Sequence, residues 1–185
     1  MEEKHCESLL EAGRGFDRAW PPRDLSTIDG VRQWVREALE AQGGGTVYPF
    51  VVVSQTDGNV IGSTRYLEAI QEHRTVEIGW TWYSPRTWGT AVNPECKLLL
   101  LRHAFEDWNA IRVQLKTDVN NLRSQRAILK LGARFEGRLR NQMVRRDGSV
   151  RDSVMYSIVQ SECPDVKIGL ESRLKALSKG GASEG

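Results

Sequence analysis

The most constraining feature of this chain is a strand that leads directly into a glycine-containing turn and then into a helix. Residues 76–83 alternate in the manner of a half-buried strand, a short turn occupies residues 86–91, and residues 93–106 predict an apolar helix. The alternation assigns Val76, Ile78, Trp80 and Trp82 to one face of the strand and Glu77, Gly79, Thr81 and Tyr83 to the other. A helix this apolar must be covered on more than one side, so the unit belongs inside a layered fold.

The turn itself has the chemistry of an anion site. Its sequence is Arg86-Thr87-Trp88-Gly89-Thr90-Ala91. Backbone amides at the start of a helix have no intrahelical acceptor, and the helix dipole adds positive charge there. The missing Cβ of Gly89 would let a phosphate approach the main chain, and Arg86 could close over it. An ordinary strand-to-helix turn is the alternative. The competing phosphate loop G-x-x-x-x-G-K-[ST] does not occur in this sequence.

The remaining elements follow from apolar periodicity and turn residues. The expected helices span 3–13, 27–42, 122–131 and 166–177, and the expected strands span 50–54, 60–67, 111–116, 135–144 and 150–159. Turns are expected at Trp20-Pro21-Pro22, Asp57-Gly58 and Arg146-Asp147-Gly148, a loop at 68–74, and a helix-ending glycine at Gly132. The order of elements predicts an α/β (α+β) fold in which helices cover both faces of a mixed sheet.

Composition sets the outer bounds. A length of 185 residues fits one domain over residues 1–177, followed by a disordered tail at 178–185. The net charge of +2 does not call for a nucleic-acid partner. No apolar run of membrane-spanning length and no signal-peptide pattern is present, so we expect a cytoplasmic protein without membrane contact. The cysteines are odd in number and lack metal-ligand spacing, which predicts neither a disulfide nor a metal site; Cys96 is expected to be a core thiol.

Two stretches together resemble the GNAT N-acetyltransferases. The turn matches that family's acetyl-CoA pyrophosphate loop, Gln/Arg-x-x-Gly-x-Gly/Ala. Residues 118–133 look like the N-x-x-S-x-x-x-x-x-K-x-G-F/A stretch of the family, most closely in the Rim-type subgroup that acetylates ribosomal-protein N-termini. The resemblance implies a mostly antiparallel central sheet, here lacking the family's first strand, and acetyl-CoA as co-substrate without a metal. It assigns cofactor binding to Trp82, Tyr83, Arg86, Thr87, Trp88, Gly89, Thr90, Ala91, Asn120, Asn121 and Ser124.

The resemblance also implies direct transfer of the acetyl group to a primary amine. Such an amine must lose a proton before it attacks, and Glu77 is the best candidate for the general base, with Glu68 and His73 weaker. The alternative for Glu77 is a solvated carboxylate on the flank of a strand. A backbone amide among residues 81–83 would stabilise the oxyanion.

The general acid departs from the common family pattern. Many members place a tyrosine seven residues after the asparagine, where this chain has Ile128, and isoleucine cannot donate a proton. The Rim-type branch instead places a serine three residues after the asparagine, which is Ser124. The alternative for Ser124 is a hydroxyl in the first helical turn, bonded to Asn120 or Asn121 as a local cap.

No motif in the sequence identifies the amine that accepts the acetyl group. A peptide N-terminus and a small-molecule amine both fit, and the expected acceptor side carries Trp20, Trp34 and Tyr66. The competing function is a nonenzymatic CoA- or RNA-binding module, whose RNA form would use Arg134, Arg138, Arg140, Arg145, Arg146 and Arg151. The oligomeric state stays open, a homodimer included.

Overall fold

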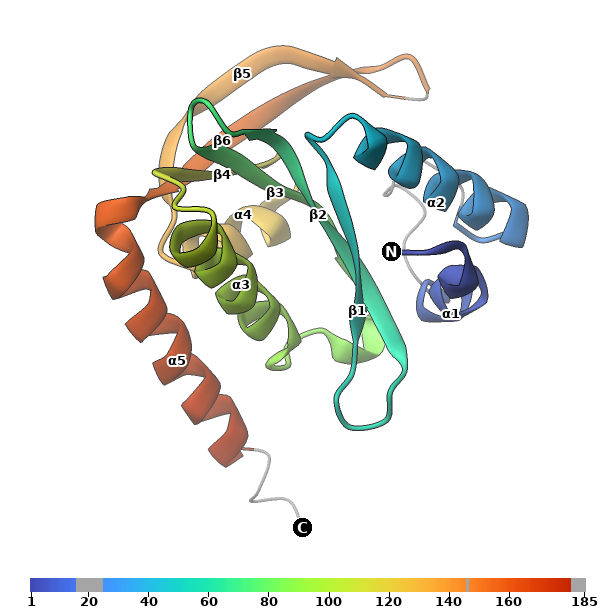
Figure 1. Cartoon of the computed structure of the whole chain (residues 1–185), viewed down its shortest axis with the longest axis horizontal. Coiled ribbons are helices and arrows are strands. Elements are labelled where there is room, and N and C mark those ends of the chain that lie inside the picture. Colours follow the sequence, from blue (N-terminus) through green and yellow to red (C-terminus); the bar gives the residue numbers. More distant parts are fainter. Residues whose placement is uncertain (16–24, 146, 181–185) are drawn as a thin grey trace. The chain divides into compact units, whose positions relative to one another are not determined.

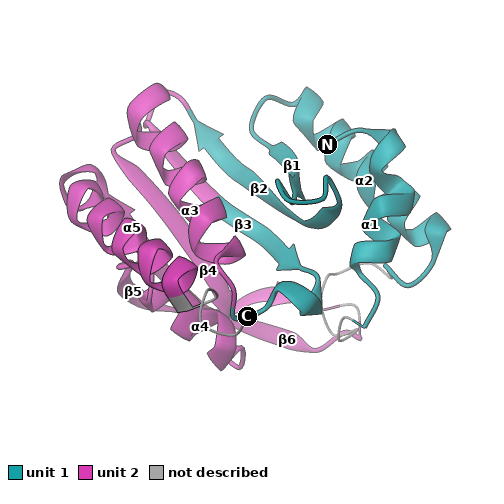
Figure 2. Ribbon diagram, turned by 90° about the horizontal axis from the view of Figure 1, so that it is seen from below, with its two compact units in different colours: residues 1–70, 78–89 teal, residues 71–77, 90–185 magenta. Residues whose placement is uncertain are grey.

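The computed structural model describes residues 1–15, 25–145 and 147–180. The chain forms two compact units, which Figure 2 shows in different colours. Unit 1 contains residues 1–70 and 78–89, and unit 2 contains residues 71–77 and 90–185. The strand β3 (Thr75–Tyr83) contributes to both, its first three residues to unit 2 and the rest to unit 1.

Unit 1 combines helices from the start of the chain with a hairpin. Its elements are η1 (Glu3–His5), α1 (Cys6–Ala12), α2 (Ile28–Gly43), β1 (Tyr48–Val53), β2 (Val60–Ile70), most of β3, and η2 (Pro85–Thr87), labelled in Figure 1 where space allows. Thr27 caps α2 by accepting a hydrogen bond from the Gly30 amide at 3.1 Å. The core contains apolar side chains from α1, α2, β2 and β3, among them Leu9, Trp34 and Trp82.

Gly62 on β2 is required by a close approach between strands. A Cβ at this position would lie 2.3 Å from the carbonyl oxygen of Trp82 and 2.9 Å from the Cα of Tyr83, both on β3. Such distances are far inside van der Waals contact, and both atoms belong to the backbone. Only glycine therefore allows β2 and β3 to lie at this spacing.

Unit 2 begins with the start of β3 and holds the C-terminal half of the chain. Its further elements are α3 (Val92–Arg102), which continues as a π-helical turn η3 (His103–Asp107), β4 (Arg112–Asp118), α4 (Leu122–Leu129), β5 (Arg134–Val144), β6 (Val150–Val159), η4 (Gln160–Glu162) and α5 (Cys163–Gly180). The helices α3 and α5 pack against each other. Gly132 ends the α4 segment with φ +95°, as predicted for a helix-ending glycine.

The strands form one six-stranded sheet in the order β1-β2-β3-β4-β6-β5. The pairs β1–β2, β4–β6 and β5–β6 are antiparallel, whereas β3 pairs with β4 in parallel, over Thr75–Glu77 and Arg112–Gln114. The predicted class, a mixed and mostly antiparallel sheet with helices, is therefore confirmed. Among the described residues no strand precedes α1, and β1 lies at the edge of the order.

Several predicted boundaries and faces need correction. β2 extends into the first residues of the loop predicted at 68–74 and ends at Ile70. α5 reaches Gly180, beyond its predicted end at Leu177. The predicted alternation in β3 fails because Glu77 is buried together with its neighbours and Trp80 takes a left-handed φ of +50°. Cys96 is half-buried, not a core residue. The predicted Trp20-Pro21-Pro22 turn, residue 146 of the hairpin turn and residues 181–185 of the predicted tail lie outside the described part.

Candidate active site

The turn after β3 is anchored to unit 1 by hydrogen bonds at its beginning. The amide of Ser84 donates to the Ile61 carbonyl at 2.8 Å, and the Thr87 hydroxyl donates to the Ser84 carbonyl at 2.8 Å. The indole Nε1 of Trp88 donates to the Tyr83 carbonyl at 3.0 Å. These bonds hold the η2 turn against the end of β3, whose last residues, Trp82 and Tyr83, have buried side chains.

The second half of the turn presents backbone amides. Gly89 has φ +80°, and a Cβ added there would meet nothing within 4 Å. The left-handed backbone favours glycine at this position, and the approach of a phosphate to the main chain stays a prediction. The amides of Gly89 and Ala91 donate to no acceptor among the described residues. Arg86 is exposed, and Val92 at the start of α3 donates to the Thr90 hydroxyl at 3.3 Å.

The first turn of α4, in unit 2, is capped by a side chain. Asn121 is its N-cap and accepts a hydrogen bond from the Ser124 amide at 3.0 Å. The cap predicted at this position is present, but its oxygen comes from Asn121 and not from the Ser124 hydroxyl. The neighbouring amide, that of Asn120, donates to Asp118 Oδ1 at 2.8 Å. Ser124 is half-buried.

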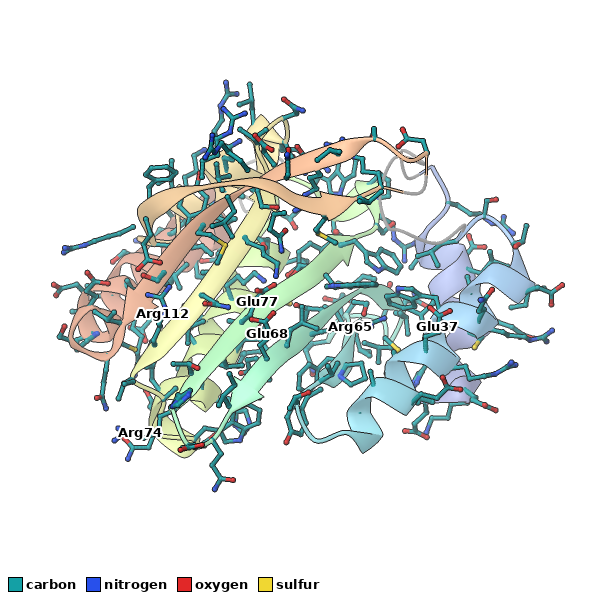
Figure 3. The ribbon with its side chains drawn as sticks, turned by 90° about the horizontal axis from the view of Figure 1, so that it is seen from above. Glu37, Arg65, Glu68, Arg74, Glu77 and Arg112 are labelled. Carbon is teal, nitrogen blue, oxygen red and sulfur yellow. The ribbon has the colours of Figure 1, made fainter. Side chains whose placement is uncertain are left out.

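Glu77 on β3 is a buried carboxylate with fixed partners in unit 2. Its residue is 1% exposed, and its Oε2 lies 3.0 Å from Nζ of Lys116 and 3.4 Å from Nε2 of Gln114, both on β4. Figure 3 labels it on the strand beside β4. The alternative of a solvated flank is therefore wrong. The other two base candidates, Glu68 and His73, are exposed, and Glu68 lies on β2, not in a loop.

A second charged cluster lies where β4 ends, and it includes two of the arginines that the RNA-binding alternative would use. Asp118 forms ion pairs with Arg145 and, at 3.7 Å, with Nε of Arg151. Burial raises the pKa of Asp118, but the Asn120 amide and the two arginines outweigh this and leave the pKa below its usual value. Burial lowers the pKa of Arg151, an effect that Asp118 and Glu77 oppose.

The arginines proposed for RNA are mostly neutralised within the protein. Ion pairs join Arg134 to Glu162, Arg138 to Asp152, and both Arg145 and Arg151 to Asp118. Arg146 lies outside the described residues. Paired arginines have less charge to offer to phosphates, so these four suit an RNA site less well, while Arg140 is exposed.

Comparison with known proteins identifies the class. A model of the acetyltransferase (GNAT) domain matches residues 2–134. This match covers more than half of the chain, which therefore belongs to the GNAT acetyltransferase family. The chain is thus an acyltransferase, and enzymes of this family use acetyl-CoA. No protein with a curated function matches the chain in sequence.

Solved structures agree with this assignment. A candidate acetyltransferase is 36% identical with a TM-score of 0.80, covering 94% of this chain and 90% of that one. A second, from T. thermophilus, is 34% identical with a TM-score of 0.83 and the same coverage. RimJ of Mycobacterium smegmatis, in complex with CoA-disulfide, is 20% identical with a TM-score of 0.79 over 94% of this chain and 86% of its own, which indicates a shared fold alone.

Two further properties concern the described residues only. No group of His, Cys, Asp and Glu side chains within them has the arrangement of a metal site. Likewise, none of their helices is long and apolar enough to cross a membrane.

Proposed function

We propose that the chain transfers an acetyl group from acetyl-CoA to a primary amine and binds the CoA pyrophosphate at residues 86–91. The observation that carries this proposal is the anchored turn, whose Gly89 and Ala91 amides have no acceptor among the described residues and whose neighbour Arg86 is exposed. Unpaired amides next to a helix start and a nearby guanidinium suit a pyrophosphate. Trp82, Tyr83, Thr87, Trp88 and Thr90 would line the bound cofactor, with Asn120, Asn121 and Ser124 as further contacts.

In the proposed reaction the neutral amine nitrogen attacks the thioester carbonyl, and the bond between carbon and sulfur then breaks. Glu77 takes the proton that the amine loses, directly or through water. The contacts of its Oε2 with Lys116 and Gln114 support this role by fixing the orientation of the carboxylate. A backbone amide of residues 81–83 stabilises the oxyanion, and the Ser124 hydroxyl gives a proton to the departing CoA thiolate.

Cofactor binding is tested by thermal melts with acetyl-CoA. A ligand that binds only the folded state stabilises it by about 2.7 kcal/mol at a hundredfold excess over Kd. We expect Arg86→Ala to weaken acetyl-CoA about tenfold, a loss of ~1.4 kcal/mol. Arg36→Ala, which changes an exposed arginine on α2, is the matched control. Absence of any melting shift at millimolar acetyl-CoA would refute the assignment of the turn.

The role of Glu77 is tested by kinetics. Glu77→Gln should lower kcat by about 10²- to 10⁴-fold while the acetyl-CoA melting shift persists. Glu171→Gln, at an exposed position on α5, is the matched control. A loss below threefold at neutral pH would reduce Glu77 to a structural partner of Lys116. Ser124→Ala should give a smaller loss, since a thiolate leaves fairly well without a proton.

The acceptor amine is proposed to be an α-amino group of a peptide or a small molecule. An α-amine has a pKa of about 8, against about 10.4 for a lysine side chain, so far more of it is neutral at pH 7. The Rim-type resemblance of residues 118–133 supports the same choice. Faster acetylation of internal lysines than of the free N-terminus of the same peptide would contradict it.

A further inference from the structure

Arg65 is a buried cation held between two aromatic rings. It lies on β2, in unit 1, and is 4% exposed. Its Cζ is 4.6 Å from the ring centroid of Trp34 on α2 and 4.5 Å from that of Trp80 on β3. These two cation–π contacts restrict the guanidinium, whose N–H groups still require hydrogen-bond acceptors. The left-handed φ of Trp80, +50°, is unusual for so bulky a residue and accompanies this arrangement.

The inner edge of this guanidinium has no acceptor among the described residues. Nε and Nη2 of Arg65 are buried and lack a hydrogen-bond partner there, and so does the indole Nε1 of Trp34. Nε and Nη2 donate from the same side of an arginine, and together they form the fork that grips a carboxylate with two parallel bonds. A buried charge without hydrogen bonds costs several kcal/mol, so an unfilled fork needs an explanation.

The surroundings compensate the charge only in part. Burial lowers the pKa of Arg65 to about 10, and the carboxylate of Glu37, half-buried on α2, acts against this shift. Figure 3 labels Arg65 and Glu37 on their two elements. Glu37 itself accepts a hydrogen bond from Gln33 Nε2 at 3.1 Å. The N–H groups without an acceptor are all hydrogen-bond donors, and those of Arg65 carry a positive charge. A ligand that suits them is therefore a planar anion that only accepts hydrogen bonds, such as a carboxylate.

We propose that Arg65, which lies over the rings of Trp34 and Trp80, binds a carboxylate group of the amine acceptor. This inference rests on the proposed acetyl transfer and narrows its substrate class to amines that also bear a carboxylate, such as peptides with an acidic residue near a free N-terminus. Nε and Nη2 lie inside the packing, so binding requires local opening of the side chains around Arg65, a change that commonly accompanies binding. Arg65 thereby acts on specificity and takes no part in the chemical step.

The test compares matched acceptors. Short peptides with a free N-terminus are prepared in pairs that differ only by Glu or Gln at the first, second or third position, and kcat/KM is measured at one pH. We expect at least one Glu peptide to exceed its Gln partner by about 10- to 100-fold, the range for a charge-assisted pair out of water. Arg65→Met, which keeps the length of the stem, should reduce the ratio of kcat/KM between Glu and Gln peptides to about one. Arg36→Met on the exposed side of α2 should preserve the preference.

The outcomes separate the two proposals. Equal rates within every Glu and Gln pair, or carboxylate-free polyamines as the best acceptors, would overturn the carboxylate site and leave acetyl transfer intact. A failure to acetylate any amine, despite an acetyl-CoA melting shift, would overturn the proposed function itself. If Arg65→Met is inactive, peptide binding is measured instead by thermal melts in the presence of CoA. The preferred Glu peptide should raise the Tm of the wild-type protein but not that of a folded Arg65→Met variant. An equal rise in both would also refute the site.

Discussion

Lys97 offers a quantitative test of the packing of unit 2. It lies on α3, is 5% exposed, and burial lowers its pKa from 10.5 to about 7, with a small opposing effect of Cys96. Between pH 7 and 10.5 the unfolded chain therefore holds a proton at this lysine that the folded protein has released. The free energy of unfolding must rise with pH across this window, by up to about 1.4 kcal/mol per pH unit. Over the whole window the free energy of unfolding would rise by ~5 kcal/mol.

Replacing Lys97 by methionine removes the charge and keeps a similar length and helix propensity. We expect the variant to be more stable than the wild type near pH 6.5, by a margin that shrinks steadily toward pH 10. Urea denaturation at intervals of one pH unit measures the difference in the free energy of unfolding between the variant and the wild type. The test is how this difference changes with pH, because other contacts of Lys97 contribute a constant offset. Lys130→Met, an exposed lysine at the end of α4, should give a flat difference. A flat difference for Lys97→Met would refute the buried, deprotonating lysine.

Three smaller predictions concern local interactions. Arg112 holds the pKa of Glu136 at about 2, so their pair stabilises the fold above pH 4.5 and loses this effect as pH falls through 2. Since Glu136 is 38% exposed, we expect Arg112→Met to cost only about 1 kcal/mol at pH 7. Melts at several pH values should show this cost becoming small at pH 2. Thr27→Ala removes the cap of α2 and should cost about 1 kcal/mol in urea denaturation, whereas Thr27→Ser should cost little. Gly89→Ala should cost about 1–2 kcal/mol through its left-handed φ alone, and Gly43→Ala, with ordinary φ and equally open space, should be neutral or slightly stabilising; equal effects would contradict the strain argument.

The fold was predictable because its signals are local. Alternation, capping residues and glycine turns lie within a few positions of one another, and they predicted the helices and strands of both units to within a few residues. The predicted strand ended at Leu67 because residues 68–74 are polar. In the structure Glu68 has φ +48°, yet β2 continues, and the Ala69 amide donates to the Thr46 carbonyl at 3.1 Å. Hydrogen bonds to a distant segment outweighed the local composition there.

The candidate site was predictable only where the same local signals apply. The turn at 86–91 is recognisable from the spacing of Arg86, Gly89 and Ala91. Glu77 was a named candidate, but its burial depends on Lys116, which is far away in sequence and adjacent only through the pairing of β3 with β4. Arg65 was missed altogether. It reads as an outward polar residue in an alternating strand, and its aromatic neighbours come from two other elements.

The contact at Gly62 has a consequence for how this sequence can change over generations. Every other amino acid carries a Cβ, and a Cβ here would collide first with the backbone of the neighbouring strand, which no exchange of side chains removes. No second mutation in a side chain can restore the space. Natural variants of this gene should therefore keep a glycine codon at position 62, while the codon for Gly43, where a Cβ meets nothing, is free to drift.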